Sequence, residues 1–145
     1  MKDQRLTDRL TQYWELIRQS DPYPPLERFN HTAVNDLWSN CMLFAVNSKT
    51  GITRSYTYYR MGDRIQALYG HDMSGQSLSP TQRMFEGAEV VKRLDEVFTN
   101  PKPLYDMGQF MTAPGGVVKF RSCLLPFGKA GTITHIIAGI SWREF

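Results

Sequence analysis

The sequence predicts an α+β fold built on a five-stranded antiparallel sheet, and three observations indicate it. Runs of strand-forming residues occur in two groups, with two strands before one long amphipathic helix and three strands after it. Short turns that contain glycine join the strands within each group, and such turns require antiparallel neighbours. The last strand, over about residues 132–142, is apolar on both faces, which is typical of a strand in the middle of a sheet.

Residues 5–19 are predicted to form an amphipathic helix. Its apolar side chains recur at the spacing of one helix face, and charged or polar residues occupy the rest of its surface. They are Leu6, Leu10, Tyr13, Trp14 and Ile17. Prolines at positions 22, 24 and 25 end the helix. We therefore expect residues 1–22 to form a helix and linker, and residues 23–145 to form the main domain.

A β-hairpin is predicted next. Residues 26–38 fit either a short helix or an irregular cover, so their structure stays open at this point. Residues 41–46 form a compact apolar run, and residues 54–61 are rich in Tyr and Thr, which favour strands. The turn between these two runs contains Gly51, which suits a positive φ angle.

Two helices are predicted between the strand groups. Asp63 can cap a short helix to residue 69, and Gly70 can close it. The longer helix begins at Pro80, a residue favoured at the first helical position, and ends before residue 100. Its predicted buried stripe consists of Met84, Ala88, Val91, Leu94 and Phe98.

Three further strands are predicted at about residues 104–112, 117–127 and 132–142. Four isoleucines and Ala138 make the last of them apolar on both faces. The helices between the strand groups can cover one face of the sheet. The amphipathic N-terminal helix is then the expected cover of the other face, because its apolar stripe must also be buried.

Composition and charge narrow the class of protein. The chain has 145 residues, which suits one domain, and a net charge of +3 with acids and bases interspersed. A nucleic-acid binder more typically clusters its bases. No apolar run approaches the roughly 20 residues of a membrane-spanning helix, and the charged N-terminus lacks the apolar region of a signal peptide. We expect a cytoplasmic protein with no membrane span and no nucleic-acid partner.

Four segments, in their order and spacing, carry a resemblance to a known family. They are YYRMG at 58–62, IxxLYGxDMSGxxL at 65–78, FRSCLLPF at 120–127 and IIAGI at 136–140. Together they resemble the PAS domain superfamily, and more closely a bacterial family of small stand-alone PAS proteins. The resemblance covers about residues 13–145. It implies a sheet with strand order 2-1-5-4-3 and helices across one face, in agreement with a central last strand.

The resemblance also implies a ligand pocket between the sheet and the helices. The candidate lining residues are Tyr58, Arg60, Tyr69, Phe85, Val91, Phe98, Arg121 and His135. Simple alternation puts Tyr58 and Arg60 on one face of the second strand and Tyr59 and Met61 on the other. Which of these faces is interior stays open.

Each candidate also has a simpler structural explanation. The aromatic side chains can be ordinary core residues, and His135 on an apolar face can be a core histidine. Arg60 and Arg121 would suit a carboxylate or phosphate if they converge inward, because a guanidinium group offers two parallel donors. If they do not converge, they are rim or salt-bridge residues.

Anchors for the cofactors of other PAS domains are missing from the sequence. Residues 81–99 contain neither the His that haem-binding members usually carry nor a Cys, and no Asn-Cys-Arg-Phe run of the flavin photosensors occurs. A thioester-linked chromophore needs a loop cysteine, whereas Cys41 and Cys123 both lie in predicted strands. No zinc-binding spacing is present. Non-covalent flavin, or haem held by another ligand, stays open, and the ligand is unknown.

The implied strand order also bears on the two cysteines. Cys41 lies on the first strand and Cys123 on the fourth, with the fifth strand between them. Two strand spacings are about 9.6 Å, which is too far for a disulfide. We therefore expect both thiols to be free.

The function indicated is that of a stand-alone PAS-type sensory or regulatory module in bacterial signalling. It would bind a small molecule, a protein partner, or both, and act in trans. We expect no enzyme, since the sequence lacks a nucleophile elbow, a zinc-protease motif and a glycine-rich phosphate loop, and Glu86 and Glu89 fit a solvated helix face. The apolar stripe of the N-terminal helix, formed by Leu6, Leu10, Tyr13, Trp14 and Ile17, predicts a homodimer contact. The alternative is a ligand-free interaction or scaffold domain that acts as a homodimer.

Overall fold

A computed structural model describes residues 5–47, 55–78, 89–111 and 115–144. The helical elements are α1 (Leu6–Arg18), the 3-10 helices η1 (Leu26–Arg28) and η2 (His31–Val34), α2 (Asn35–Trp38), α3 (Asp63–Tyr69) and α4 (Glu89–Thr99). The strands are β1 (Cys41–Asn47), β2 (Ser55–Met61), β3 (Ser77–Leu78), β4 (Leu104–Met111), β5 (Val117–Lys129) and β6 (Thr132–Glu144). Short helices thus form the stretch that the sequence left open. Among the described helices, none has the length and apolar character that crossing a membrane requires.

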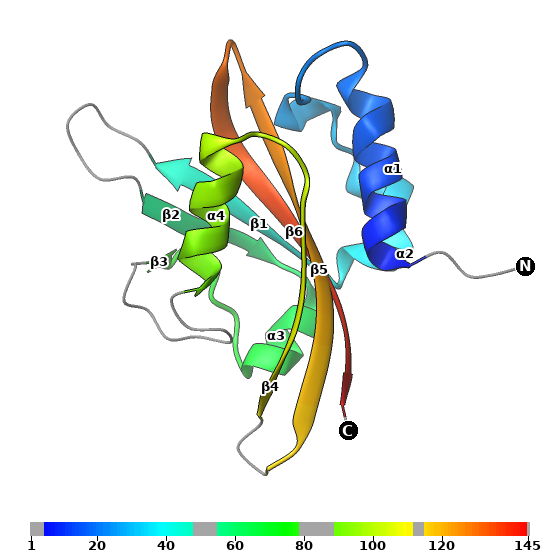
Figure 1. The fold of residues 1–145 in the computed structure, drawn as a ribbon, viewed down its shortest axis with the longest axis vertical. Helices are drawn as coiled ribbons and strands as arrows, with labels where there is room; N and C mark the ends of the chain where they lie inside the picture. Colours follow the sequence, from blue (N-terminus) through cyan, green and yellow to red (C-terminus); the bar gives the residue numbers. More distant parts are fainter. Residues whose placement is uncertain (1–4, 48–54, 79–88, 112–114, 145) are drawn as a thin grey trace, which may run out of the picture.

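The strands form one antiparallel sheet in the order β3-β2-β1-β6-β5-β4 (Figure 1). The predicted order and the central place of the last strand are therefore confirmed. One strand was not expected, because β3 is only two residues long and pairs with the edge of β2. The predicted long helix is described only from residue 89, so Met84, Phe85, Glu86 and Ala88 lie outside the described residues.

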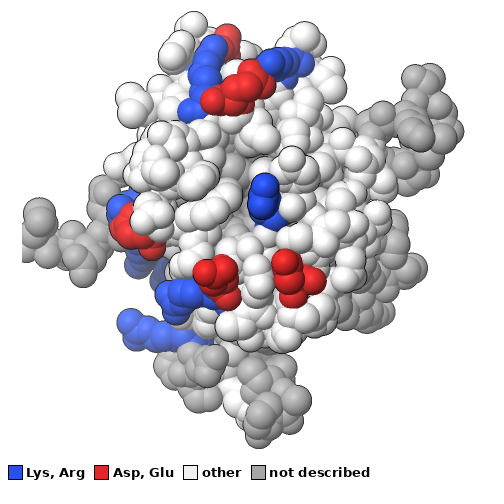
Figure 2. All heavy atoms as spheres, turned by 180° about the vertical axis from the view of Figure 1, so that it is seen from behind, with Lys and Arg blue, Asp and Glu red and all other residues white. Residues whose placement is uncertain are grey.

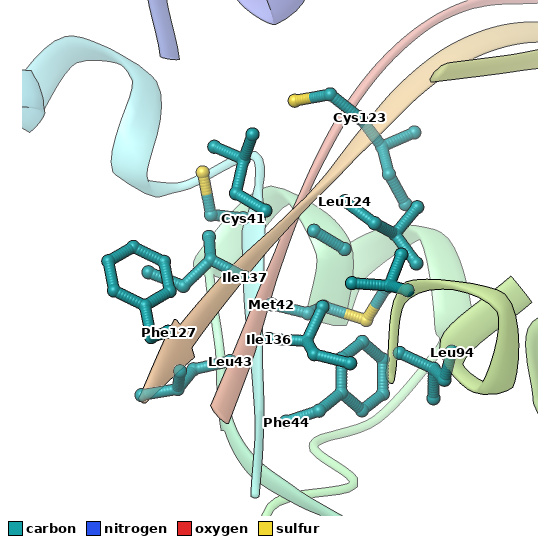
Figure 3. Packing of buried hydrophobic residues seen from close by; sticks show 14 of the residues in the cluster. Cys41, Met42, Leu43, Phe44, Leu94, Cys123, Leu124, Phe127, Ile136 and Ile137 are labelled. Atoms are coloured by element: carbon teal, nitrogen blue, oxygen red, sulfur yellow. The ribbon is translucent and has the colours of Figure 1, made fainter. Parts of the chain in front are cut away.

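The sheet separates two layers of core side chains. Figure 3 shows Met42, Phe44 and Ile136 on the side of Leu94 from α4, whereas Cys41, Ile137 and Phe127 lie on the other side of the strands. We call these the α4 face and the α1 face. Leu94, Phe44 and Ile137 are all fully buried or nearly so. Burial on both faces explains why the last strand is apolar throughout.

Helix α1 covers the α1 face, on the opposite side of the sheet from α4 (Figure 1). Leu10 has no exposed surface, and it lies so close to Gly139 of β6 that a Cβ atom there would overlap it. The indole Nε1 of Trp14 donates a hydrogen bond to the carbonyl oxygen of Pro126 at 2.8 Å. The N-terminal helix is therefore the cover that the sequence predicted for this face.

Both cysteines lie in the layer under α1. Cys41 of β1 and Cys123 of β5 each pair with Gly139, from opposite sides of β6. Both are buried and free. Burial raises the pKa of the Cys123 thiol to about 12 and raises that of Cys41 as well, so neither is a reactive thiolate near neutral pH.

A β-bulge in β2 corrects the predicted alternation of its side chains. Leu43 pairs with Arg60 and Phe44 pairs with Tyr58, so Tyr59 is an extra residue in the strand. The bulge puts Tyr58 on the α4 face with Phe44, and it puts Arg60 on the α1 face with Leu43. The expectation that Tyr58 and Arg60 share a face was therefore wrong.

Candidate ligand site between α4 and the sheet

A small cavity lies where α4 crosses the centre of the sheet. Its volume is ≈ 30 Å³, which is room for about one or two water molecules. It is lined by Met42, Phe44, Tyr69, Val90, Arg93, Leu94, Asp106, Ser122, Leu124, Ala138 and Ile140. The gap exists because two sheet positions facing α4, Ala138 of β6 and Ser122 of β5, carry small side chains.

The phenol groups of Tyr58 and Tyr69 lie on the β2 side of the cavity. Tyr58 is fully buried, and its ring packs on Phe44 with the ring centroids 5.3 Å apart. The ring of Tyr69 from α3 meets Tyr58 edge-on at 6.4 Å between centroids. Burial raises the pKa of Tyr58, and the neighbouring Tyr69 hydroxyl opposes that rise. The Tyr58 phenol therefore stays protonated near neutral pH and can donate a hydrogen bond.

Polar contacts hold α4 at both sides of the cavity. The guanidinium Nε of Arg93 lies 3.0 Å from a carboxylate oxygen of Asp106 on β4. Toward the other edge of the sheet, the hydroxyl of Tyr56 on β2 donates to the carboxylate of Asp95. Arg93 and Asp106 are also lining residues, so this ion pair closes one wall of the cavity. Helix α4 cannot move away from the sheet without disturbing these contacts.

Four of the candidate lining residues lie on the α4 side. Tyr58 and Val91 are buried, whereas Tyr69 and Phe98 are half-buried and pack against the same core. Only Tyr69 among these four lines the cavity directly. Phe85, the fifth candidate from the helical region, lies outside the described residues.

Three other candidates lie on the α1 face. Arg60 and Arg121 are exposed, so they do not converge on an interior anion, and the rim interpretation fits them. The guanidinium of Arg60 lies over the ring of Tyr59 at 5.9 Å.

His135 pairs with Ala45 and is half-buried, with its Nδ1 atom 2.9 Å from the Thr134 hydroxyl oxygen. Its ring also meets Tyr59 edge-on, with 6.0 Å between the ring centroids. Burial lowers the pKa of His135. His135 therefore belongs to the α1 face and takes no part in the cavity under α4.

The apolar stripe of α1, which was predicted to form a dimer contact, packs against the sheet of its own chain. Leu10 and Trp14 are buried against the sheet, and Leu6, Tyr13 and Ile17 pack partly buried against the same core. A large apolar sheet face needs a cover, and α1 supplies it. A contact between two chains through Leu10 or Trp14 would remove these side chains from their own sheet.

Sequence reasoning missed the groups that shape the cavity. Ala138 and Ser122 were visible as small residues in predicted strands, but their meeting beneath α4 depends on the β5–β6 register, in which Leu124 pairs with Ala138. The pairing of Arg93 with Asp106 depends on the course of the chain between α4 and β4. Within the described ranges, no group of three or more His, Cys, Asp or Glu side chains could hold a metal ion.

Comparison with known proteins gives one family. The sequence profile described as "PAS domain" matches residues 1–141. Among solved structures, the chain is similar to the PAS domain of an HTR-like protein from Haloarcula marismortui, with 22% identity, a TM-score of 0.44, and coverage of 79% of this chain and 90% of that one. It is also similar to a sensory box histidine kinase/response regulator from Burkholderia thailandensis E264, with 13% identity, a TM-score of 0.44, and coverage of 78% and 84%. No curated protein matches the chain.

Proposed function

This chain belongs to the PAS domain family, and from that membership we propose that it senses a small molecule held between α4 and the sheet. PAS domains are generally sensory, non-catalytic modules of signalling proteins, and we propose the same non-catalytic, cytoplasmic role here. The observation that supports the site is the cavity beneath Leu94, where Ala138 and Ser122 leave the core unfilled.

The dimensions of the cavity determine how a ligand would enter. Ligand pockets usually have volumes of about 300–1,000 Å³, whereas this cavity has ≈ 30 Å³. A ligand therefore requires α4 to move outward from the sheet. Such a movement would stretch the Arg93–Asp106 ion pair on one side and the Tyr56–Asp95 hydrogen bond on the other.

The lining indicates the chemistry of the ligand. Most of the cavity wall is apolar, with Met42, Phe44 and Leu94 among its largest side chains. The polar groups are the phenol of Tyr69, the hydroxyl of Ser122 and the ion pair at the mouth. We propose a compact, largely apolar molecule with a hydrogen-bond acceptor directed at Tyr69, or with a carboxylate that replaces Asp106 at Arg93.

Native mass spectrometry of the freshly purified full chain tests this function. We expect a co-purifying mass that is released on unfolding. Ala138→Leu should remove that mass, because the larger side chain occupies the space beneath Leu94. Ala45→Leu is the matched control, since it adds the same atoms on the α1 face. Equal retention of the mass by both variants would disprove the site.

A second candidate is a ligand-free interaction domain that acts as a homodimer. Two observations favour it: the cavity is small, and Leu16 of α1 is 73% exposed on the side of the helix away from the sheet. Sedimentation of the full chain beside Leu16→Glu tests this candidate. A dimer that the variant dissociates, together with the absence of any co-purifying mass, would favour it over the sensor.

A further inference from the structure

The α1 face of the sheet continues beyond the end of the helix that covers it. Cross-strand pairing defines successive rows of side chains on this face. The row Tyr105–Cys123–Gly139 lies beside α1, where Thr11 accepts a hydrogen bond from the Tyr105 hydroxyl at 2.9 Å. The next two rows extend past Arg5, which precedes the helix. They consist of Met107, Arg121 and Ser141, and then Gln109, Lys119 and Arg143. We call these six residues the basic platform.

Three of the six platform residues, Lys119, Arg121 and Arg143, are cations. Lys119 and Arg143 stand directly opposite one another on β5 and β6, and like charges in that position destabilise a sheet. Arg121 and Arg143 are exposed and form no ion pair within the described part of the chain. Arg5, exposed and likewise without an ion pair there, borders the same surface depression as Arg121 and Arg143.

Several other cations on the described surface have acidic partners. Arg9 pairs with Asp36, Arg28 with Asp21, and Lys129 with Glu27. Figure 2, which views the molecule from behind, shows acidic and basic side chains together at the top, and a group of basic side chains at the lower left with acidic side chains beside it. Arg121 and Arg143 of the platform differ from these three cations, since neither forms an ion pair within the described part of the chain.

An apolar side chain lies within the platform. Met107 is 64% exposed beside Arg121, and Tyr105 of the adjoining row is 53% exposed. A flexible thioether next to guanidinium groups suits an amphipathic partner, because it adapts to different apolar side chains. The guanidinium groups of Arg121 and Arg143 can each take a carboxylate through two parallel hydrogen bonds. Asp8 and Asp106 border the same depression as Arg5 and Arg121, and neither acid forms an ion pair with these two arginines within the described part of the chain.

We propose that the basic platform docks an acidic, amphipathic segment of a partner protein. The platform lies on the sheet face opposite the ligand cavity, so this inference goes beyond the proposed sensory function and does not depend on it. A nucleic acid fits less well, because the platform and Arg5 together supply four cations, fewer than the about 6–10 phosphate contacts of a duplex binder with strongly salt-dependent affinity. The exposed Met107 would also have no role against a phosphate backbone.

Fluorescence anisotropy with a labelled peptide in which Glu alternates with Phe tests this proposal on the full chain. We expect saturable binding at low salt that weakens at high salt, because exposed ion pairs are screened over about 10 Å at 0.1 M ionic strength. Arg121→Glu combined with Arg143→Glu should weaken binding about tenfold or more. A peptide with Gln in place of Glu should bind the wild-type protein as weakly as the acidic peptide binds the double variant. Met107→Ser should weaken binding without changing its dependence on salt.

Arg60→Glu is the matched control for Arg121→Glu alone, because each reverses one charge on the same sheet face, but Arg60 lies on β2. It should leave the affinity unchanged. If the double Glu variant does not fold, Arg121→Gln with Arg143→Gln removes the charges without reversing them. The proposal is overturned if the acidic peptide does not bind, or if Arg60→Glu weakens binding as much as Arg121→Glu does. It is also overturned if single-stranded DNA or phosphatidylserine vesicles bind the platform more tightly than the peptide does.

Discussion

Ala138 and Gly139 are consecutive residues of β6 that face opposite layers of the molecule. Ala138 lines the cavity beneath α4, whereas Gly139 lies against Leu10 of α1. A ligand that displaces Ala138 would therefore also displace Gly139, the next residue of β6, which packs against α1. This arrangement gives the proposed sensor a short physical connection between a ligand under Leu94 and the position of α1.

Gly139→Ala should destabilise the protein. The new Cβ would overlap the end of Leu10, which is fully buried. Overpacking of this kind costs about 1–3 kcal/mol, and urea denaturation of the full chain measures it. Combining the change with Leu10→Ala should cost less than the sum of the two single changes. Additive losses would show that α1 does not pack on this glycine.

Trp14→Phe tests the attachment of α1 to β5. The variant keeps an aromatic ring but loses the hydrogen bond from the indole to the Pro126 carbonyl. We expect the free energy of unfolding to fall by about 1–3 kcal/mol, because a buried carbonyl loses its partner. Tyr13→Phe is the control, since its hydroxyl contacts Asn30 at an exposed site. A smaller loss for Trp14→Phe than for the control would argue against the attachment.

The central place of the last strand and the double cover of the sheet could be predicted from local patterns, whereas the full strand order came from the resemblance to PAS domains. The apolar run at Ile136 and Ile137 requires burial on both faces, and the stripe of α1 requires a surface to cover. Both requirements are visible in the sequence, and a sheet with helices on both faces and the last strand at its centre satisfies them. The free cysteines follow from the same order, since Gly139 stands between Cys41 and Cys123.

The placement of the candidate site residues could not be predicted so well, because it depends on register. One extra residue at Tyr59 reverses the faces of the side chains after it, and nothing in the alternation of β2 marks that position. For the same reason Arg60 lies on the α1 face while Tyr58 lines the core beneath α4. Ser122 and Ala138 leave a cavity only because the register of β5 and β6 places both of them beneath Leu94.

Asp106→Asn should loosen α4 from the β4 side of the sheet. The amide keeps its size but loses the charge that faces Arg93 at 3.0 Å. We expect faster hydrogen exchange in α4, with little change in β6, because only one contact of the helix is weakened. Asp36→Asn, which weakens a surface ion pair with Arg9, is the control. Unchanged exchange in α4 would mean that this ion pair does not restrain the helix.

The stability of the protein should depend on His135 at mildly acidic pH. Burial lowers its pKa in the folded state, so the unfolded chain binds a proton first as the pH falls. The free energy of unfolding should therefore decrease as the pH falls below about 6.5, and level off below the folded-state pKa. Urea midpoints of wild type and His135→Gln measure this. Plotted against pH, the urea midpoints of the two proteins should run parallel above about pH 6.5, and the two plots should converge or cross as the pH falls below that value.

Electron density between Leu94 and Ala138, in a crystal structure of protein purified without added ligand, is the most direct test of the sensory function. We expect density for a non-protein molecule there, with α4 displaced outward and the Arg93–Asp106 distance longer than 3.0 Å. Leu94 packed directly on Ala138, with both anchoring contacts of α4 intact and no bound molecule after incubation with the co-purifying fraction, would contradict the proposed sensory function.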